Sequence, residues 1–270
     1  MELEIENGVL KKIHMIYFGD DDIKDIVIPY GVTKIGFQAF ASDRHQIDSI
    51  TIPDTVTEID DGAFWGCHIT SLTIPDSVIS IGNDAFFMCD RLESITIPDS
   101  VISIGNNAFS DCDRLGSVTM GKNVISIGDG AFHCCRSLKS VTILNSVTSI
   151  GDYAFISDEK LESITFGNSL TSIGKFAFNF CKSLKSITLP DSVTEIGESA
   201  FEDCPSLTSL TIGKGLKVFG DYAFSGCDNL KNITLPSREF KLNPKAFDSS
   251  IRKAFEERDV SNFIINYKEN

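Results

Sequence analysis

The chain of 270 residues is acidic, with 38 Asp and Glu residues against 24 Lys and Arg residues and a net charge of −14. It lacks the basic footprint that phosphate binding requires, which excludes nucleic acid and anionic membranes as main partners. No stretch approaches the roughly 18 consecutive apolar residues of a membrane span, so we expect no membrane insertion.

The first predicted element is a hairpin within residues 1–22. Apolar residues flank Asn7-Gly8, which is the strongest short hairpin signal. We interpret residues 1–22 as a cap over the open end of the array that follows. Glu2, Glu4 and Glu6 interrupt the apolar run, so no signal peptide is predicted here.

Residues 23–247 repeat one pattern. An Ala-Phe pair recurs at steps of 24, 22 and then 23 residues, at positions 39–40, 63–64, 85–86, 108–109, 131–132, 154–155, 177–178, 200–201, 223–224 and 246–247. A fixed period in the low twenties is typical of a solenoid, whose short units bury their apolar residues only by stacking. The extra residue of the first unit falls in the loop 41–46, a corner that tolerates length changes.

The unit around Phe109 shows the elements expected in each coil. Residues 94–97 alternate polar and apolar side chains, as a half-buried strand does, and Pro98 ends the strand. A second extended piece follows at 101–104. Gly105-Asn106 then predicts a reversal into a helical turn with Asn106 as its cap. Phe109 is the inward plug of the coil.

After Pro236 the pattern decays. We interpret residues 248–270 as a C-terminal cap, with a short helix around Ile251, Ala254 and Phe255 and a final strand at 263–265. The sequence therefore predicts one continuous domain: a β-rich repeat solenoid of ten coils between two caps.

The motifs ITIPDSV, SIGNDAF and AFxxC resemble those of the BspA-type leucine-rich repeat family. The resemblance covers about residues 23–247. It implies a curved right-handed leucine-rich-repeat superhelix with a parallel sheet on the concave side and short strands or helical turns on the convex side. It also implies a scaffold for binding, as in bacterial surface adhesins and secreted proteins, without a shared catalytic apparatus.

Seven of the eight cysteines lie three residues after a plug phenylalanine: Cys67, Cys89, Cys112, Cys135, Cys181, Cys204 and Cys227. A fixed offset predicts a buried column in which free cysteine fills space as a small apolar residue, although disulfides between stacked neighbours stay open. Cys134 lies outside this column and is the candidate for an exposed thiol. His133-Cys134-Cys135 lacks a second pair of ligands for zinc, so no metal or cofactor is predicted.

No catalytic constellation is evident. The four histidines, at positions 14, 45, 68 and 133, have no serine, cysteine or acid in a recognisable arrangement. Lys214 lies between two glycines but lacks the rest of a phosphate-binding loop. Asp99, Asp191 and their equivalents follow a turn proline, where we expect the carboxylate to bond its own backbone rather than calcium. We expect no enzyme activity.

Two surfaces are candidates for binding. On the concave sheet, rows of Ser and Thr run beside charged positions that vary: Glu93, Lys139, Glu162, Lys185 and Lys231. At the convex corner after Ala-Phe, large side chains replace small or acidic ones: Trp65, Phe87, Met88, His133, Ile156 and Phe180. Trp65 and Phe87 fall in adjacent coils, and Trp is enriched at interface hot spots. Both sets also have a structural explanation, because Thr suits strands and corner side chains can cover a neighbouring coil.

The sequence therefore predicts a monomeric, non-catalytic binding scaffold for protein-protein interaction or adhesion. The alternative is a carbohydrate-binding module that uses the hydroxyl-rich concave sheet, although that face lacks the aromatic platforms on which sugars stack. The compartment stays open. The cysteines suit a reducing, cytoplasmic environment, whereas the family resemblance points to the cell surface or secretion, with a leader removed.

Overall fold

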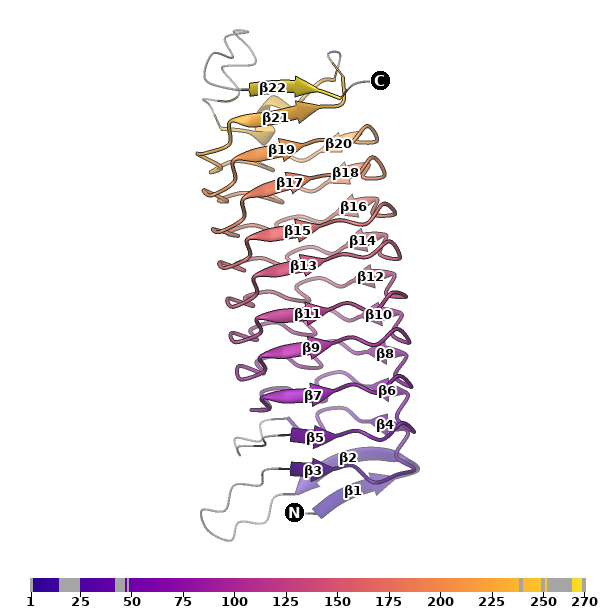
Figure 1. The fold of residues 1–270 in the computed structure, drawn as a ribbon. Helices are drawn as coiled ribbons and strands as arrows, with labels where there is room; N and C mark the ends of the chain where they lie inside the picture. Colours follow the sequence, from indigo (N-terminus) through magenta and orange to yellow (C-terminus); the bar gives the residue numbers. More distant parts are fainter. Residues whose placement is uncertain are drawn as a thin grey trace.

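The computed structural model of the chain describes residues 2–14, 25–41, 47, 49–237, 240–248, 251 and 264–268. Figure 1 shows a stack of coils with the N-terminus at one end and the C-terminus at the other. Each repeated coil places one short strand on the front of the stack and one on the back. The predicted corner loop 42–46 and the predicted helix after Ile251 lie outside the described residues.

The front face carries the strands that the SIT-like segments predict. These strands are β3 (Asp25–Val27), β5 (Ser49–Thr51), β7 (Ser71–Thr73), β9 (Ser94–Thr96), β11 (Ser117–Thr119), β13 (Ser140–Thr142), β15 (Ser163–Thr165), β17 (Ser186–Thr188), β19 (Ser209–Thr211) and β21 (Asn232–Leu235). They pair in parallel as four ladders: β3-β5-β7, β9-β11, β13-β15 and β17-β19-β21, and β22 (Ile264–Tyr267) joins the last of them. In β9 the central Ile95 is buried between exposed Ser94 and Thr96, which is the alternation of a half-buried strand.

The back face carries the longest sheet, which the second extended pieces form. Its strands are β4 (Lys34–Ile35), β6 (Glu58–Ile59), β8 (Ser80–Ile81), β10 (Ser103–Ile104), β12 (Ser126–Ile127), β14 (Ser149–Ile150), β16 (Ser172–Ile173), β18 (Glu195–Ile196) and β20 (Val218–Phe219). With β1 (Glu2–Glu6) and β2 (Val9–His14) they form eleven strands in one sheet. The second residue of each of these two-residue strands is a buried isoleucine, except in β20, where it is the half-buried Phe219, so the strands line the core.

The N-terminal hairpin extends the back sheet. Strands β1 and β2 pair antiparallel around Asn7 and Gly8, which have φ angles of 50° and 77°. Positive φ at both turn residues is the geometry that Asn-Gly favours. Strand β2 then pairs in parallel with β4 of the first coil. At the other end, β22 pairs in parallel with β21 and contains residues 264 and 265 of the predicted final strand, whose first residue lies outside the described residues.

The predicted helical turn is wrong. The segment 105–112 forms tight turns, because alternate amides donate to the next coil rather than to their own. The amide of Phe86 donates to the carbonyl of Ala108 at 2.7 Å, and that of Phe109 donates to Ala131 at 2.8 Å. The third side of each coil is therefore also a hydrogen-bonded stack. The described helix is limited to Ile251 and the short 3-10 turn η1 (Pro244–Ala246).

Side-chain amides and carboxylates also form hydrogen bonds with the next coil. Asn106 does not cap its own turn, since its Oδ1 accepts a hydrogen bond from the amide of Asp129 in the next coil at 2.9 Å. Asp99 likewise accepts from the amide of Lys122 at 3.0 Å, so the expected bond to its own backbone is also wrong. A tight turn leaves these acceptors facing the next coil, where an amide lies within reach.

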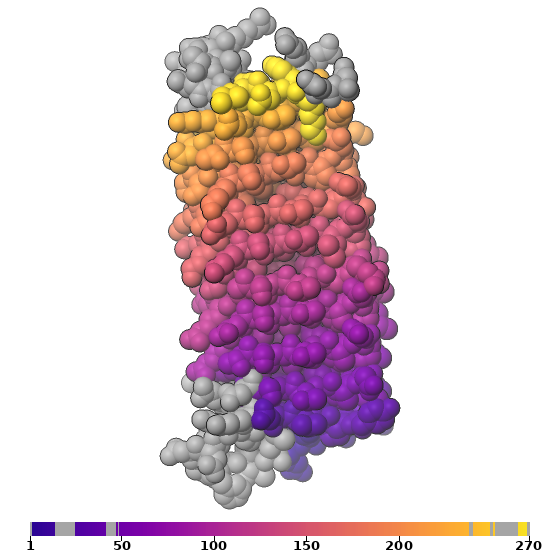
Figure 2. Space-filling model, viewed as in Figure 1, coloured from indigo at the N-terminus to yellow at the C-terminus, as the bar shows by residue number. Residues whose placement is uncertain are grey.

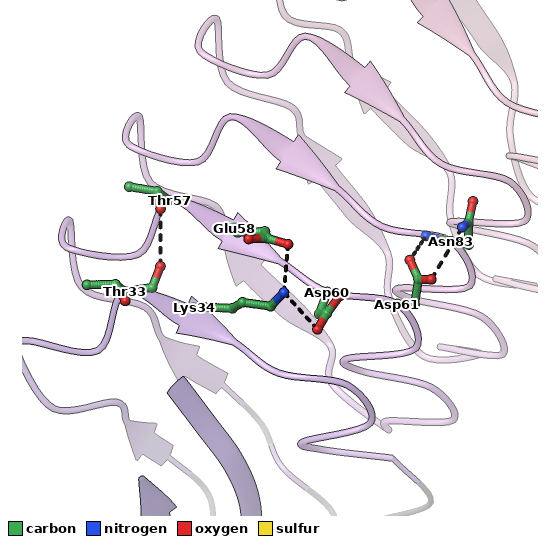
Figure 3. A network of polar contacts seen from close by, with 7 residues as sticks. All are labelled: Thr33, Lys34, Thr57, Glu58, Asp60, Asp61 and Asn83. Atoms are coloured by element: carbon green, nitrogen blue, oxygen red, sulfur yellow. Dashed lines mark hydrogen bonds and ion pairs between the residues drawn. The ribbon is translucent and has the colours of Figure 1, made fainter. Parts of the chain in front are cut away.

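Figure 3 shows the first of these contacts between coils. The Asp61 carboxylate accepts from the backbone amide of Asn83 at 2.7 Å and from its side-chain nitrogen at 3.4 Å. Nearby, the Lys34 ammonium lies 2.7 Å from Glu58 and 2.9 Å from Asp60. The hydrogen bond to Glu58 and the charge of both carboxylates raise the pKa of Lys34. Hydrogen bonds and ion pairs between polar residues therefore link neighbouring coils at the surface.

Aromatic rings link neighbouring coils in the core. The phenylalanine column comprises Phe40, Phe64, Phe86, Phe109, Phe132, Phe155, Phe178, Phe201, Phe224 and Phe247, all of them buried. Consecutive ring centroids lie 4.9–5.6 Å apart at interplanar angles of 3–20°. The rings are therefore stacked nearly parallel, at centroid distances typical of aromatic pairs. The predicted inward plugs are confirmed, and the packed layers form a continuous rod (Figure 2).

Candidate functional site

The turn corner is the segment that contains Ala-Phe in each coil, such as 105–112. Two of its positions have positive φ. The first left-handed column is the residue before Ala: Gln38, Gly62, Asp84, Asn107, Gly130, Tyr153, Phe176, Ser199 and Tyr222. The second left-handed column is the second residue after Phe: Gly66, Met88, Asp111, Cys134, Ser157, Phe180, Asp203 and Gly226.

Several of these positions carry residues that the backbone does not favour. Gly, Asn and Asp enter the left-handed region readily, whereas other residues are strained there by about 1 kcal/mol or more. Yet Tyr153 and Tyr222 stand in the first column and Met88 and Phe180 in the second, with 42–51% of each side chain exposed. Backbone geometry does not explain these choices, so they are features of the surface.

The structure brings three predicted corner residues together. Trp65 and Phe87 lie edge to face, with ring centroids 5.4 Å apart at 86°. The Trp65 side chain is 38% exposed and the neighbouring Met88 is 49% exposed. We call Trp65, Phe87 and Met88 the N-terminal corner patch. Beside it is an open hollow of about 630 Å³, lined by Trp65, Gly66, His68, Met88, Asp90, Asp111 and Asp113.

The other three predicted corner residues lie farther along the rod. His133 and Ile156 are half-buried, in the same position of the coil as Trp65 and Phe87, and Phe180 is exposed. Sequence reasoning missed Tyr153 and Phe176 in these coils, whose rings stack at 5.2 Å and 1°. The available signal was the replacement of Gly, Asn or Asp by an aromatic residue immediately before Ala.

The five variable positions beside the front sheet, Glu93, Lys139, Glu162, Lys185 and Lys231, are all exposed. Lys185 forms an ion pair with Glu162 of the preceding coil. This hydrogen bond, with the charge of Lys185, lowers the pKa of Glu162. Part of the charge on this face is thus neutralised within the protein.

Comparison with known proteins identifies the repeats. The family model described as the BspA type leucine rich repeat region matches in six copies, over residues 11–126 and 149–265. The chain belongs to the BspA-type leucine-rich repeat family. Its members are in general non-catalytic scaffolds. No curated protein shows a significant match to the chain.

Two solved structures have the same fold. A leucine-rich repeat protein from Bacteroides ovatus is 33% identical with a TM-score of 0.61, and the match covers 78% of this chain and 63% of that one. A leucine-rich repeat protein from Eubacterium ventriosum is 23% identical with a TM-score of 0.53, covering 85% of this chain and 64% of that one. The chain thus matches less than two thirds of the length of either relative.

The cysteine column of this BspA-type array is buried, and all eight cysteines are free. The column thiols bond coil to coil: Cys135 Sγ donates to the carbonyl of Phe109 at 3.2 Å, and five other thiols repeat this contact. The expected exposed thiol at Cys134 is wrong, because that side chain is only 7% exposed, with Arg136 Nη2 3.5 Å from its sulfur. Burial raises the pKa of Cys134.

The cysteine column contains a residue that departs from the repeat pattern. Asp158 occupies the cysteine position of its coil and is fully buried. Neither carboxyl oxygen has a hydrogen-bond partner among the described residues. Burial therefore raises the pKa of Asp158 well above its ordinary value, which the nearby backbone of Cys135 opposes. The sequence signal was simple, since 158 is 23 residues after Cys135 and 23 before Cys181.

Within the described residues, no group of three His, Cys, Asp or Glu side chains is arranged to hold a metal ion. No described segment forms a helix with the length and hydrophobicity needed to cross a membrane. His133 Nδ1 lies 3.4 Å from Ser110 Oγ, which donates to Asp111 at 3.1 Å. Because the imidazole does not stand between serine and aspartate, this chain of contacts is not the arrangement of a hydrolytic triad.

Proposed function

We propose that the protein is a non-catalytic scaffold that binds a protein partner through the N-terminal corner patch, as an adhesion or interaction module. The observation that carries the proposal is the corner cluster of exposed Trp65 and Met88 with the half-buried Phe87. Trp is among the residues that dominate interface energies, and a rigid surface loses little conformational entropy on binding.

The surroundings of the patch indicate the character of the partner. Asp90, Asp111 and Asp113 line the hollow beside Trp65. Asp90 lies 3.8 Å from His68, and Asp113 is paired with Arg136 at 2.6 Å. An apolar centre with a negative rim favours a partner that presents an apolar side chain flanked by basic ones, since complementary charge raises association rates and specificity.

The test is the double variant Trp65→Ser/Phe87→Ser against a panel of purified extracellular-matrix and bacterial envelope proteins. We expect the parent protein to bind a member of the panel and the double variant to lose at least about tenfold in affinity, which is about 1.4 kcal/mol. Tyr222→Ser, which removes an exposed aromatic ring from a coil near the C-terminal end, is the control and should bind as the parent does.

Two outcomes contradict the proposal. Unchanged binding by the double variant removes the patch from the interface. A fall in Tm of more than about 4 °C, which exceeds roughly 1 kcal/mol for a domain of this size, assigns Trp65 and Phe87 to the core instead.

The alternative of carbohydrate recognition on the front sheet has one observation in its favour. Over β5 and β7 there is a shallow hollow of about 270 Å³, and its polar lining includes Ser49, Thr51, Ser71 and Thr73. Rows of hydroxyls can both donate to and accept from sugar hydroxyls. A Thr51→Val/Thr73→Val variant keeps the strand shape and β-propensity, so loss of glycan-array signals in this variant alone would support this function.

A further inference from the structure

The first left-handed column has a gap at Gly130. In consecutive coils this column runs Asn107, Gly130, Tyr153, Phe176, so a residue without a side chain stands between an amide and an aromatic ring. An open hollow of about 320 Å³ lies there, lined by Asn106, Asn107, Asp129, Gly130, His133, Tyr153 and Ile156. Its size is at the lower end of the range for small-ligand sites.

One wall of the hollow is a flat aromatic ring. Tyr153 is stacked on Phe176 at 5.2 Å and 1°, and the hollow lies on the side of Gly130, the opposite neighbour in the column. The Tyr153 side chain is 45% exposed although its φ is 60°. The stack on Phe176 fixes the orientation of the ring, so a ligand that packs on it meets a preorganised surface.

The remaining walls are polar. A Cβ added to Gly130 would lie 2.2 Å from Asn107 Oδ1, which shows that the Asn107 amide leans over the glycine. Among the described residues the Asn107 side chain has no hydrogen-bond partner. Asp129 uses Oδ1 to accept from the amide of Asp152 at 2.8 Å, so its second oxygen remains as an acceptor. His133 faces Ser110 through Nδ1, so Nε2 is left for a ligand.

We propose that this hollow binds one pyranose ring of a neutral oligosaccharide, stacked on Tyr153, with its hydroxyls on Asn107, Asp129 and His133. The C–H face of a sugar carries partial positive charge and packs on the negative face of an aromatic ring. Its hydroxyls lie at the rim of the ring, where amide, carboxylate and imidazole groups can pair with them. An apolar side chain in the same place would leave those groups without partners, and an anionic ligand would meet Asp129 and a chain of net charge −14.

This site is independent of the proposed protein interface. The two hollows share no lining residue. The site also differs from the hydroxyl rows of the front sheet, because it supplies the aromatic platform that those rows lack. Either proposal can therefore fail without the other.

The test is isothermal titration of the full chain with five probes: the hexasaccharides of β-1,4-glucose, β-1,3-glucose, β-1,4-mannose, β-1,4-xylose and β-1,4-N-acetylglucosamine. Gly130→Asn fills the hollow, and its Cβ also displaces the Asn107 amide, one of the proposed binding groups. It suits the left-handed backbone, as Asn107 does one coil earlier, and the clash it makes is with a movable amide oxygen. Tyr153→Asn removes the ring. Tyr222→Asn removes an equally exposed ring at the same coil position elsewhere and is the matched control.

We expect at least one hexasaccharide to bind, with affinity reduced at least tenfold by Gly130→Asn and by Tyr153→Asn and changed less than twofold by Tyr222→Asn. Lack of heat with all five probes overturns the proposal. Binding that survives Gly130→Asn overturns it as well, and loss in the Thr51→Val/Thr73→Val variant would place the sugar on the front sheet instead. If Tyr153→Asn weakens a protein partner and no sugar, the ring belongs to the protein interface.

Discussion

The phenylalanine column and the turn corner are adjacent in the chain but differ in what they tolerate. Phe155 is fully buried and stacks on Phe132 and Phe178, whereas the next residue, Ile156, is half-buried. The corresponding corner residues in other coils include Trp65 and His133. An interior side chain must fit the coils on both sides of it, so a change in one coil is felt in three. The corner side chains Trp65, His133 and Ile156 are exposed or half-buried, so packing constrains them less.

The comparison shows which variations are informative. A variable corner residue can record selection for a partner, because packing does not determine it. A variable interior residue is an exception that costs stability. Asp158 is such an exception in the cysteine column, and the predictions below test the contrast between interior and corner.

The largest effect is expected at Phe132. The Phe132→Ala variant leaves a cavity between Phe109 and Phe155, whose ring centroids lie 5.3 and 5.2 Å away. We expect the free energy of unfolding to fall by about 3–5 kcal/mol in urea titrations. His133→Ala, one residue along and half-buried, is the matched control and should cost about 1 kcal/mol or less. Equal losses in the two variants would show that the corner is part of the core.

The second-largest effect should be an increase in the free energy of unfolding, in a variant of Asp158. Asp158→Cys restores the residue of the neighbouring coils and removes a buried carboxyl without hydrogen-bond partners. Leaving such a group unpaired costs about 1–3 kcal/mol, so we expect the variant to be more stable by this amount near neutral pH. Asp158→Asn, which removes the charge and keeps a buried polar group, should gain less. A loss of stability in the Cys variant would contradict the assignment of Asp158 as a defect in the column.

The stability gained by Asp158→Cys should increase as the pH rises from about 3 to about 7. Burial raises the pKa of Asp158, so the folded protein holds a neutral carboxyl where the unfolded chain, with a pKa of about 3.9, is ionised. Below about pH 3.9 both states are protonated, and as the pH rises toward the folded pKa the parent protein loses stability. The difference between Asp158→Cys and the parent should therefore be smallest near pH 3 and largest near pH 7 in paired urea titrations. The comparison cancels the opposite pH dependence of Asp99 and Asp191, whose pKa values are lowered by hydrogen bonds from lysines.

Much of the fold could be predicted because one unit is repeated. The spacing of Ala-Phe and the alternation of residues 94–97 located the phenylalanine column and the front strands. The repeat spacing also placed Trp65 and Phe87 in adjacent coils, and the structure shows the two rings in contact. The family model then confirmed the repeat family.

The turn corner was mispredicted for a physical reason. The amide of Phe109 bonds to Ala131, 22 residues away, so the partners that make this segment a stack are not visible in the local sequence. Taken alone, the glycine, asparagine and alanine of this segment predict a helical turn. The gap at Gly130 depends on the same register between coils, since it is defined by Asn107 on one side and Tyr153 on the other.

The smallest stability effect is expected at Asn83, an exposed residue of the turn corner. Its Oδ1 accepts from the backbone amide of Asn106 at 2.8 Å, at the surface of the rod. Asn83→Ala removes this hydrogen bond and the longer one from Asn83 Nδ2 to Asp61 (3.4 Å), but it leaves the amide of Asn106 open to water. We therefore expect a loss of about 0.5–1.5 kcal/mol in urea titrations, well below the loss in Phe132→Ala. Hydrogen exchange should locate the effect, with the Asn106 amide exchanging faster and the buried Ala108 amide unchanged. A global increase in exchange would instead mean that the surface contacts and the phenylalanine column are one cooperative unit, and that the contrast between interior and corner does not extend to stability.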